Sequence, residues 1–146
     1  MMTVTPDQVA TLRALLVGDI EGHKRAFGQL DREAAKTGYT ALLAAAFAEA
    51  VERRFANGGT KPDVVAFVGN VRVRTEDLAD SIEPHIAERL ILAVFTDEEI
   101  DDIDAATKYR LYPTLLAGLI VDEQFSGPEL DAFLSEAREL ADEWLA

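Results

Sequence analysis

Residues 41–52 read Ala-Leu-Leu-Ala-Ala-Ala-Phe-Ala-Glu-Ala-Val-Glu, and no other stretch carries a clearer structural signal. Alanine has the highest helix propensity of the common residues. Larger apolar side chains recur along this segment at every fourth position, at Leu43, Phe47, Val51 and Phe55. Asn57-Gly58-Gly59 follows and supplies residues that tolerate positive φ, where helices commonly end. The sequence therefore predicts a core helix that begins at Thr40 and that other helices can approach closely at its alanines.

Helix start signals recur on both sides of this core segment. A Ser or Thr followed three residues later by an acidic or amide side chain can form a capping box at the start of a helix. In it, each of the two side chains accepts a hydrogen bond from the other residue's backbone N–H. Such pairs begin at Thr5, Thr60, Thr96 and Ser126. We expect the pair at Thr96 to form a capping box that opens a short acidic turn to Ile103. Asp104 is then expected to cap a helix that runs toward Val121.

Two segments invite specific expectations about where helices stop. Apolar residues recur at helical spacing between Ile20 and Ala34, and we expect one helix there that Gly38 ends. Its other face carries four cations, Lys24, Arg25, Arg32 and Lys36. Pro113 lies too deep in the helix after Asp104 to belong to its first turn, so that helix is expected to kink or break there.

Residues 64–74 are the ambiguous part of the sequence. Val65, Val68 and Val71 suit a helix, and the start signal at Thr60 precedes them. Val-Val-Ala-Phe-Val, then Gly69-Asn70, then Val-Arg-Val-Arg also suits a hairpin with a two-residue turn. We favour the helix, because the sequence offers no other strand with which an isolated hairpin could pair.

The whole pattern predicts an all-α fold. We expect residues 1–146 to form one domain, a helical bundle of about seven to nine helices, because no linker longer than about five residues appears. A short helix is expected from Thr75 to near Ile82, a longer one from Pro84, and the last after Ser126.

Composition excludes several classes of protein. The chain has no Cys and only two His, which removes disulfides, thiolate chemistry and histidine-rich metal sites. Its longest stretch without a charge, Leu111 to Val121, has eleven residues, whereas a membrane span needs about 20. The N-terminus lacks the basic and apolar regions of a secretory signal. We therefore expect a cytoplasmic protein with no membrane span and no cofactor.

Charge is distributed unevenly along the chain. The net charge of −13 combines residues 1–74, with 10 Lys and Arg against 8 Asp and Glu, and residues 75–146, with 4 against 19. A chain this acidic repels nucleic acid and anionic membranes at long range. The charge asymmetry indicates either that the acidic half faces a basic partner or that the near-neutral half forms the contact surface.

Two pairs of carboxylates raise an enzymatic hypothesis. Two tetrapeptides separated by 24 residues, Glu49-Ala50-Val51-Glu52 and Asp77-Leu78-Ala79-Asp80, each place two acids three positions apart on a predicted helix. The pattern resembles the all-α nucleotide pyrophosphohydrolases, in which ExxE is followed by ExxD, although Asp77 stands where that family has Glu. The resemblance implies an Mg²⁺ site at Glu49, Glu52, Asp77 and Asp80.

A second alternative is nucleic-acid binding. Residues 75–82 and 84–90 look like the two short helices of a helix-turn-helix motif. Only Glu83 separates them, and the second helix offers one Arg and one His beside Glu88, so we do not expect nucleic acid as the partner.

The interpretation that we favour is a non-enzymatic protein-interaction or regulatory module. No catalytic set of residues stands out in the sequence, whereas the charge asymmetry provides an interaction surface. Its candidate contact residues are the four arginines at two predicted helix ends, Arg53, Arg54, Arg72 and Arg74. The partner is expected to be a protein, and the sequence leaves homodimer formation open.

Overall fold

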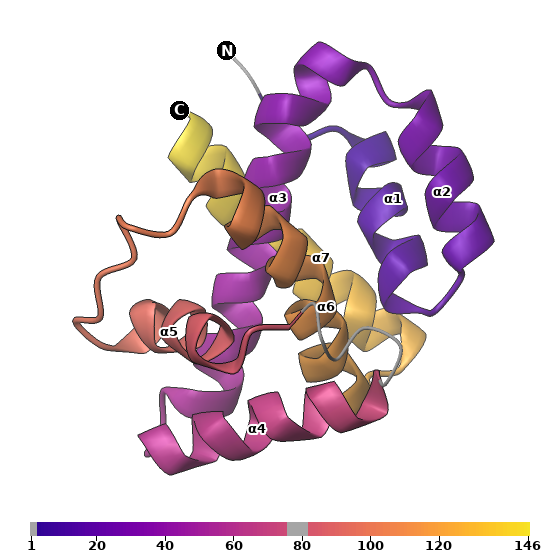
Figure 1. Ribbon diagram of the computed structural model, residues 1–146. Coiled ribbons are helices and arrows are strands. Elements are labelled where there is room, and N and C mark those ends of the chain that lie inside the picture. Colours follow the sequence, from indigo (N-terminus) through magenta and orange to yellow (C-terminus); the bar gives the residue numbers. More distant parts are fainter. Residues whose placement is uncertain (1–2, 76–81) are drawn as a thin grey trace. The chain divides into compact units, whose positions relative to one another are not determined.

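The computed structural model describes residues 3–75 and 82–146. Within these residues the chain is all-helical, with seven helices and no strand, which confirms the predicted fold class (Figure 1). In chain order the helices are α1 (Pro6–Leu16), α2 (Ile20–Gln29), α3 (Arg32–Phe55), α4 (Lys61–Arg74), α5 (Pro84–Phe95), α6 (Ala105–Glu123) and α7 (Gly127–Leu145). None of these seven helices combines the length and the apolar character that crossing a membrane requires.

The helices fall into two compact units. We call residues 1–47 with 120–146 the terminal unit and residues 48–119 the central unit. The long helices α3 and α6 each contribute residues to both. The expectation of one domain over residues 1–146 stays a prediction.

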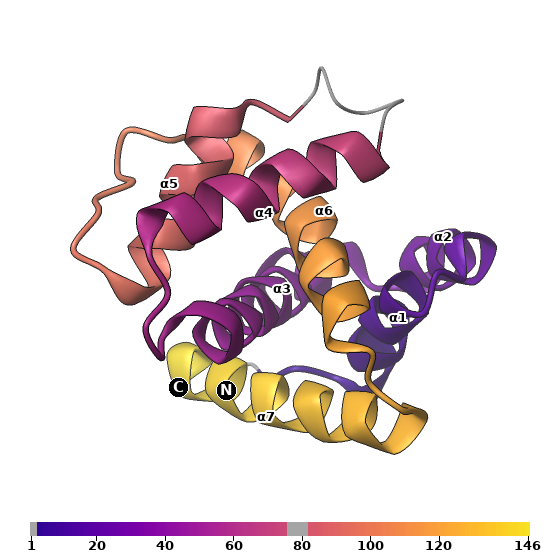
Figure 2. The same ribbon diagram turned by 90° about the horizontal axis from the view of Figure 1, so that it is seen from below.

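The terminal unit contains α1 and α2 side by side, together with α7 and the first two thirds of α3 (Figures 1 and 2). Its buried apolar residues include Leu12, Leu16, Leu42, Leu43, Leu130, Phe133 and Leu134. Two polar contacts tie α7 to the N-terminal segment. The backbone N–H of Val4 donates to Asp142 Oδ1 at 2.7 Å, and Arg13 Nε donates to Asp131 Oδ1 at 2.7 Å.

The central unit contains α4 beside α5, with the end of α3 and most of α6 (Figure 2). Its core is built around Phe55, whose ring lies 6.0 Å from that of Phe67 and 5.8 Å from that of Phe95, between centroids. The predicted apolar stripe of α3 is confirmed, since all four of its members are buried: Leu43, Phe47, Val51 and Phe55.

The core helix α3 begins at Arg32, so the predicted start at Thr40 is wrong. The predicted capping pairs start helices at three of four positions. Capping boxes begin α1 at Thr5, α4 at Thr60 and α7 at Ser126. The capping box predicted at Thr96 is wrong. The Thr96 hydroxyl donates to the Leu92 carbonyl at the end of α5 and accepts from Glu98 N–H at 3.2 Å. It therefore stabilises the end of α5 and the turn that follows, and no helix starts at Thr96.

The ambiguous residues 64–74 are helical. They belong to α4, and burial follows the helical spacing of Val64, Phe67, Val68 and Val71. The favoured reading is confirmed because these four side chains share one face of a helix, where the core of the central unit can bury them.

The expected single helix over residues 20–38 is wrong. Leu30 adopts an extended conformation, with φ −68° and ψ 143°, and ends α2. The Asp31 carboxylate accepts from Glu33 N–H at 3.0 Å as α3 begins, which supplies a start signal inside the predicted helix. Gly38 lies in the interior of α3 and ends nothing. It is small because α1 packs there: a Cβ on Gly38 would lie 2.5 Å from Gln8 Oε1.

The predicted break of the helix at Pro113 does not occur. Pro113 lies inside α6, and the helix continues on both sides of it without a break. Proline removes one backbone donor from a helix but leaves the remaining hydrogen bonds in place. The predicted cap of this helix is confirmed, since Asp104 Oδ1 accepts from Thr107 N–H at 2.8 Å. The short helix predicted over residues 75–82 falls almost wholly on residues 76–81, outside the described part of the chain.

Arg89 fastens the acidic turn that follows α5. Its guanidinium donates to both carboxylate oxygens of Asp102, at 2.9 and 2.7 Å, and to the Glu99 carbonyl at 2.7 Å. Glu98 Oε2 lies 3.5 Å from Arg89 Nε. The hydrogen bond from Arg89 holds the pKa of Asp102 down, at about 2.

The fit of α1 against α3 yields a first prediction. Replacing Gly38 with Ala should lower the free energy of unfolding by about 1–3 kcal/mol, because the buried Gln8 side chain must move and weaken its bonds to Thr5 N–H and the Ala34 carbonyl. Urea denaturation measures this change. Gly28→Ala is the matched control: a Cβ on Gly28 meets nothing within 4 Å, so stability should stay the same or rise by up to about 1 kcal/mol.

The Arg89–Asp102 pair yields a second prediction. In Arg89→Met the pKa of Asp102 should rise from about 2 toward the ordinary value of about 3.9. Since the folded state lowers this pKa, its contribution to stability is present above about pH 4 and is lost as the pH falls toward 2. Carboxyl carbon NMR titration measures the shift. Arg110→Met, which removes the ion pair with Glu83 instead, should leave the Asp102 titration unchanged.

Candidate binding site on helices α2 and α3

Helix α2 is unusual in burying none of its residues. It starts at Asp19, whose carboxylate accepts from Gly22 N–H at 2.9 Å, and it lies beside α1. Two large apolar side chains seven positions apart remain about half exposed, Ile20 at 48% and Phe27 at 50%. Helices in folded proteins normally bury their apolar stripe. The face of α2 that carries Phe27 is therefore available for contact with another molecule.

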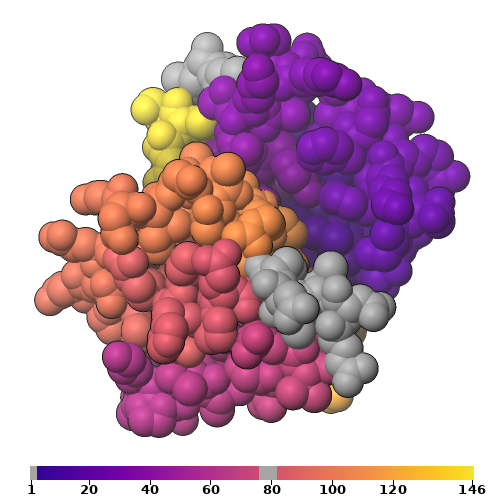
Figure 3. Space-filling view, in the orientation of Figure 1, coloured from indigo at the N-terminus to yellow at the C-terminus, as the bar shows by residue number. Residues whose placement is uncertain are grey.

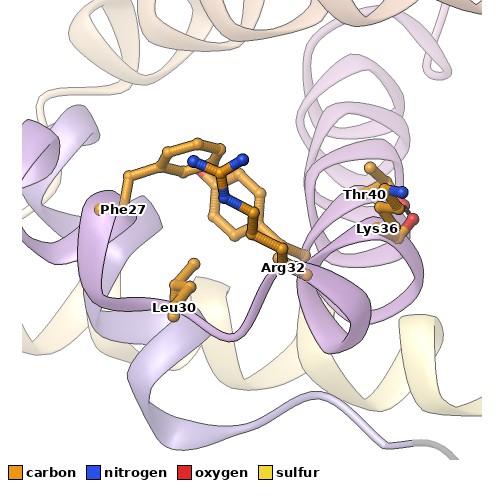
Figure 4. A pocket seen from close by; sticks show the side chains of 8 residues that line it. Phe27, Leu30, Arg32, Lys36 and Thr40 are labelled. Atoms are coloured by element: carbon orange, nitrogen blue, oxygen red, sulfur yellow. Dashed lines mark hydrogen bonds between the residues drawn. The ribbon is translucent and has the colours of Figure 1, made fainter.

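A pocket opens between the end of α2 and the start of α3 (Figure 4). Its volume is about 400 Å³, which is within the usual range for ligand pockets. The residues that matter for its chemistry are Phe27, Leu30, Arg32, Lys36, Tyr39 and Thr40. All of them belong to the terminal unit. In Figure 3 the N-terminal part of the chain, to which α2 and the start of α3 belong, is coloured indigo to purple. The extended conformation of Leu30 ends α2 and changes the direction of the chain before α3 begins. The pocket lies at this change of direction.

Aromatic rings form the apolar wall of this pocket. The rings of Phe27 and Tyr39 pack edge to face, with centroids 5.5 Å apart and planes at 73°. The His23 ring lies 6.0 Å from Phe27, and its Nδ1 is 3.0 Å from the Thr11 carbonyl oxygen. Burial raises the pKa of Tyr39 to about 12, so its phenol stays neutral at physiological pH.

Two cations stand at the rim of the pocket. Figure 4 shows the Arg32 side chain extending across the opening on the side of Phe27, with Lys36 one turn further along α3. Lys24 and Arg25 are exposed on α2. Within residues 3–75 and 82–146, none of these four cations forms an ion pair. Other arginines do find carboxylates, as Arg13 does with Asp131.

The four arginines predicted as contact residues have partners within the protein. Arg54 lies over the rings of Phe55 and Phe67, 5.6 and 5.2 Å from their centroids, in a cation–π arrangement. Arg74 Nε donates to the Asn70 carbonyl at 3.4 Å. Each of Arg53, Arg54, Arg72 and Arg74 makes at least one interaction, and all lie in the central unit. Their role in binding a partner stays a prediction.

The carboxylate set predicted for Mg²⁺ is only half described. Glu49 and Glu52 lie on α3, Glu52 exposed and Glu49 partly buried with an interaction of its own. Asp77 and Asp80 lie outside the described residues. Among the residues that the structure does describe, no group of three or more His, Asp or Glu side chains could hold a metal ion.

The second helix of the predicted helix-turn-helix is α5. One face of this helix is buried, with Ala87, Leu90 and Ile91 among its inward-facing residues. Its one arginine, Arg89, binds Asp102 and the Glu99 carbonyl, so its guanidinium is occupied by anions of the same unit. These contacts give no support to phosphate binding by α5.

Sequence reasoning missed the pocket because it placed the pocket residues on opposite faces of one continuous helix. In that helix Phe27 and Leu30 face inward while Arg32 and Lys36 face outward. The break at Leu30 instead brings the apolar and the basic residues to one opening. The signal that could have revealed it is Asp31, a capping residue preceded by an apolar one.

Comparison with known proteins adds no assignment to this geometry. No protein family, no curated protein and no solved structure matches the chain at a significant level.

The buried wall of the pocket yields a third prediction. In a variant with Tyr109→Phe and Tyr112→Phe, Tyr39 is the one remaining tyrosine, and its phenol should ionise at about pH 12 rather than near 10. Adding Phe27→Ala uncovers the Tyr39 ring, so its pKa should fall toward 10. Ultraviolet absorbance of the tyrosinate measures both titrations. An unchanged midpoint after Phe27→Ala would mean that Phe27 does not shield Tyr39.

Proposed function

We propose that this chain is a non-enzymatic protein-interaction module whose α2–α3 pocket binds an acidic, apolar helical segment of a partner protein. One observation carries the proposal: in a chain of net charge −13, an aromatic pocket opens to solvent beside two cations that pair with no carboxylate of the described residues. An acidic partner would supply the missing carboxylates, and an apolar side chain of that partner would fill the pocket.

The apolar and charged parts of the surface have different roles. Binding energy at protein interfaces comes mostly from a few large side chains that enter desolvated pockets. The wall formed by Phe27 and Tyr39 suits such an anchor. Exposed ion pairs contribute only about 0–1 kcal/mol each, so Arg32 and Lys36 act mainly on specificity and on the rate of association.

The shape of the surface favours a helical partner segment. Ile20 and Phe27 are two turns apart on α2, about 10 Å along the helix axis, and the pocket continues beyond Phe27. An amphipathic helix presents anchors at positions i, i+3 or i+4, and i+7, which match this spacing. Acidic residues beside those anchors would face Lys24 on α2 and Arg32 and Lys36 at the start of α3.

The experiment uses two synthetic helical peptides of identical apolar stripe, one with Glu and one with Lys at every flanking position. Fluorescence anisotropy measures their affinity for the whole chain. The Glu peptide should bind at least 10-fold more tightly than the Lys peptide, and added salt should weaken the binding. Charge reversal in Arg32→Glu with Lys36→Glu should lower the affinity for the Glu peptide by 10-fold or more, and Phe27→Ser should do the same without reversing the charge preference.

The control reverses the cations that were predicted from the sequence. Arg53→Glu with Arg72→Glu changes the net charge by the same amount but lies in the central unit. It should leave the affinity within about twofold, since neither residue lines the pocket. Equal loss in both charge-reversed variants would show a response to net charge alone and would overturn the assignment to the pocket, as would equal binding of the two peptides.

A further inference from the structure

The C-terminal turns of α7 expose a tryptophan beside two carboxylates. Trp144, the one tryptophan of the sequence, is 52% exposed. Both glutamates near it, Glu136 and Glu143, are exposed, and neither forms a hydrogen bond or an ion pair within residues 3–75 and 82–146. Spacing of i, i+4, i+7 and i+8 places four residues on one side of the helix, which we call the Trp144 face: Glu136, Leu140, Glu143 and Trp144.

The Trp144 face has the features that the proposed function requires of a partner segment. It is helical and acidic, and its apolar residues Leu140 and Trp144 are four positions apart, as helix-in-groove recognition requires. Tryptophan is enriched among the anchors of protein interfaces, whereas valine is under-represented. Outside α2, the other large apolar side chains that the structure describes as exposed are all valines. Trp144 is therefore the best anchor that this chain presents.

The α2–α3 pocket is complementary to this face in its rings and in its charges. The aromatic wall of Phe27 and Tyr39 offers an indole the edge and face contacts that aromatic rings prefer. Arg32 extends across the opening (Figure 4), where its guanidinium would lie over the entering indole, the ring that attracts cations most strongly. The two glutamates of the Trp144 face would then meet Lys24 and Lys36, which pair with no carboxylate of the described residues.

The Trp144 face does not fill the pocket of its own chain. The pocket is lined by residues of α2, of α3 and of the segment between them. Figures 1 and 2 both show the C-terminal end of α7 apart from α2. Every copy therefore carries both surfaces at different places, and a contact between them joins two copies head to tail.

We infer that the partner of the α2–α3 pocket is a second copy of this chain, whose Trp144 enters the pocket. This inference rests on the proposed function, since it names the acidic helical segment that the pocket binds. The Debye length at physiological ionic strength is about 8 Å, so the charges at the junction act more strongly than the net charge of −13 on each copy. One helix face in one pocket is smaller than a standard interface of roughly 1,200 Å², and the copies therefore associate reversibly as the protein concentration rises.

The fluorescence of Trp144 reports the junction directly, because the chain has no other tryptophan. Its emission should move to shorter wavelengths as the protein concentration rises, since the indole leaves water for an apolar pocket. Phe27→Ser removes part of the pocket wall and should abolish this movement without touching Trp144. A wild-type emission spectrum that is the same at every concentration would overturn the inference.

Sedimentation velocity measures the same association by size. Trp144→Ser should weaken self-association about 10-fold or more, as expected for the loss of an interface anchor. Val121→Ser is the matched control, because it removes an apolar side chain that is 60% exposed in the same unit and should leave association within about twofold. Equal losses in the two variants would contradict a specific role of Trp144.

A charge exchange between the two surfaces tests which groups meet. Glu136→Lys with Glu143→Lys, and separately Arg32→Glu with Lys36→Glu, should each weaken self-association about 10-fold or more. An equimolar mixture of the two variants should associate again, because each basic helix face then meets an acidic pocket and each acidic face a basic one. A mixture that stays monomeric would overturn the pairing.

The control for net charge is Asp97→Lys with Asp101→Lys, at two exposed acids of the central unit. It changes the net charge by the same amount as the exchange on α7 and should not weaken association. A loss equal to that of Glu136→Lys with Glu143→Lys would show that the Trp144 face is not the contact.

The synthetic Glu peptide separates this inference from the proposed function. Excess Glu peptide should occupy the pocket and return the Trp144 emission to that of the dilute protein. If the peptide binds the pocket while the wild-type chain stays monomeric at every concentration, the proposed function stands and the second copy is not the partner. If the peptide does not bind and the chain stays monomeric, both fail.

Discussion

The separation of α2 from α3 at Leu30 and Asp31 is the constraint on which the binding site depends. The extended backbone of Leu30 ends one helix, and the Asp31 carboxylate accepts a hydrogen bond from Glu33 N–H in the first turn of the next. Without this break, residues 20–38 would form one straight helix with cations on one face and apolar residues on the other. With it, Phe27 and Arg32 lie at the same opening, and Tyr39 becomes the wall of a pocket.

The cations of this acidic chain fall into two physical groups. Arg13, Arg89 and Arg110 bind carboxylates of their own unit, and Arg54 lies over aromatic rings. The cations of α2 and the start of α3 form no ion pair within the described residues. In a chain of net charge −13, these cations give the surface around α2 and the start of α3 a local positive charge that an acidic partner could meet.

Local signals in the sequence were sufficient for most of the helices. The capping pairs at Thr5, Thr60 and Ser126 act through backbone groups three residues away, so neighbouring residues decide them. The same pattern failed at Thr96, where the hydroxyl binds the end of α5 instead. Gly38 was misread as a helix end, because nothing local distinguishes a terminating glycine from one that makes room for Gln8, 30 positions earlier.

The sequence by itself determined the helical class, the apolar stripe of α3 and the helical state of residues 64–74, because helix propensity, capping and apolar spacing act over a few residues. Only the tertiary structure decided which cations are left without carboxylates and which apolar side chains are left exposed. Both depend on residues far apart in the chain: Arg13 finds Asp131, whereas Arg32 and Lys36 find no carboxylate among the described residues. The candidate site could therefore be identified only from the tertiary structure, which shows which cations have carboxylate partners and which do not.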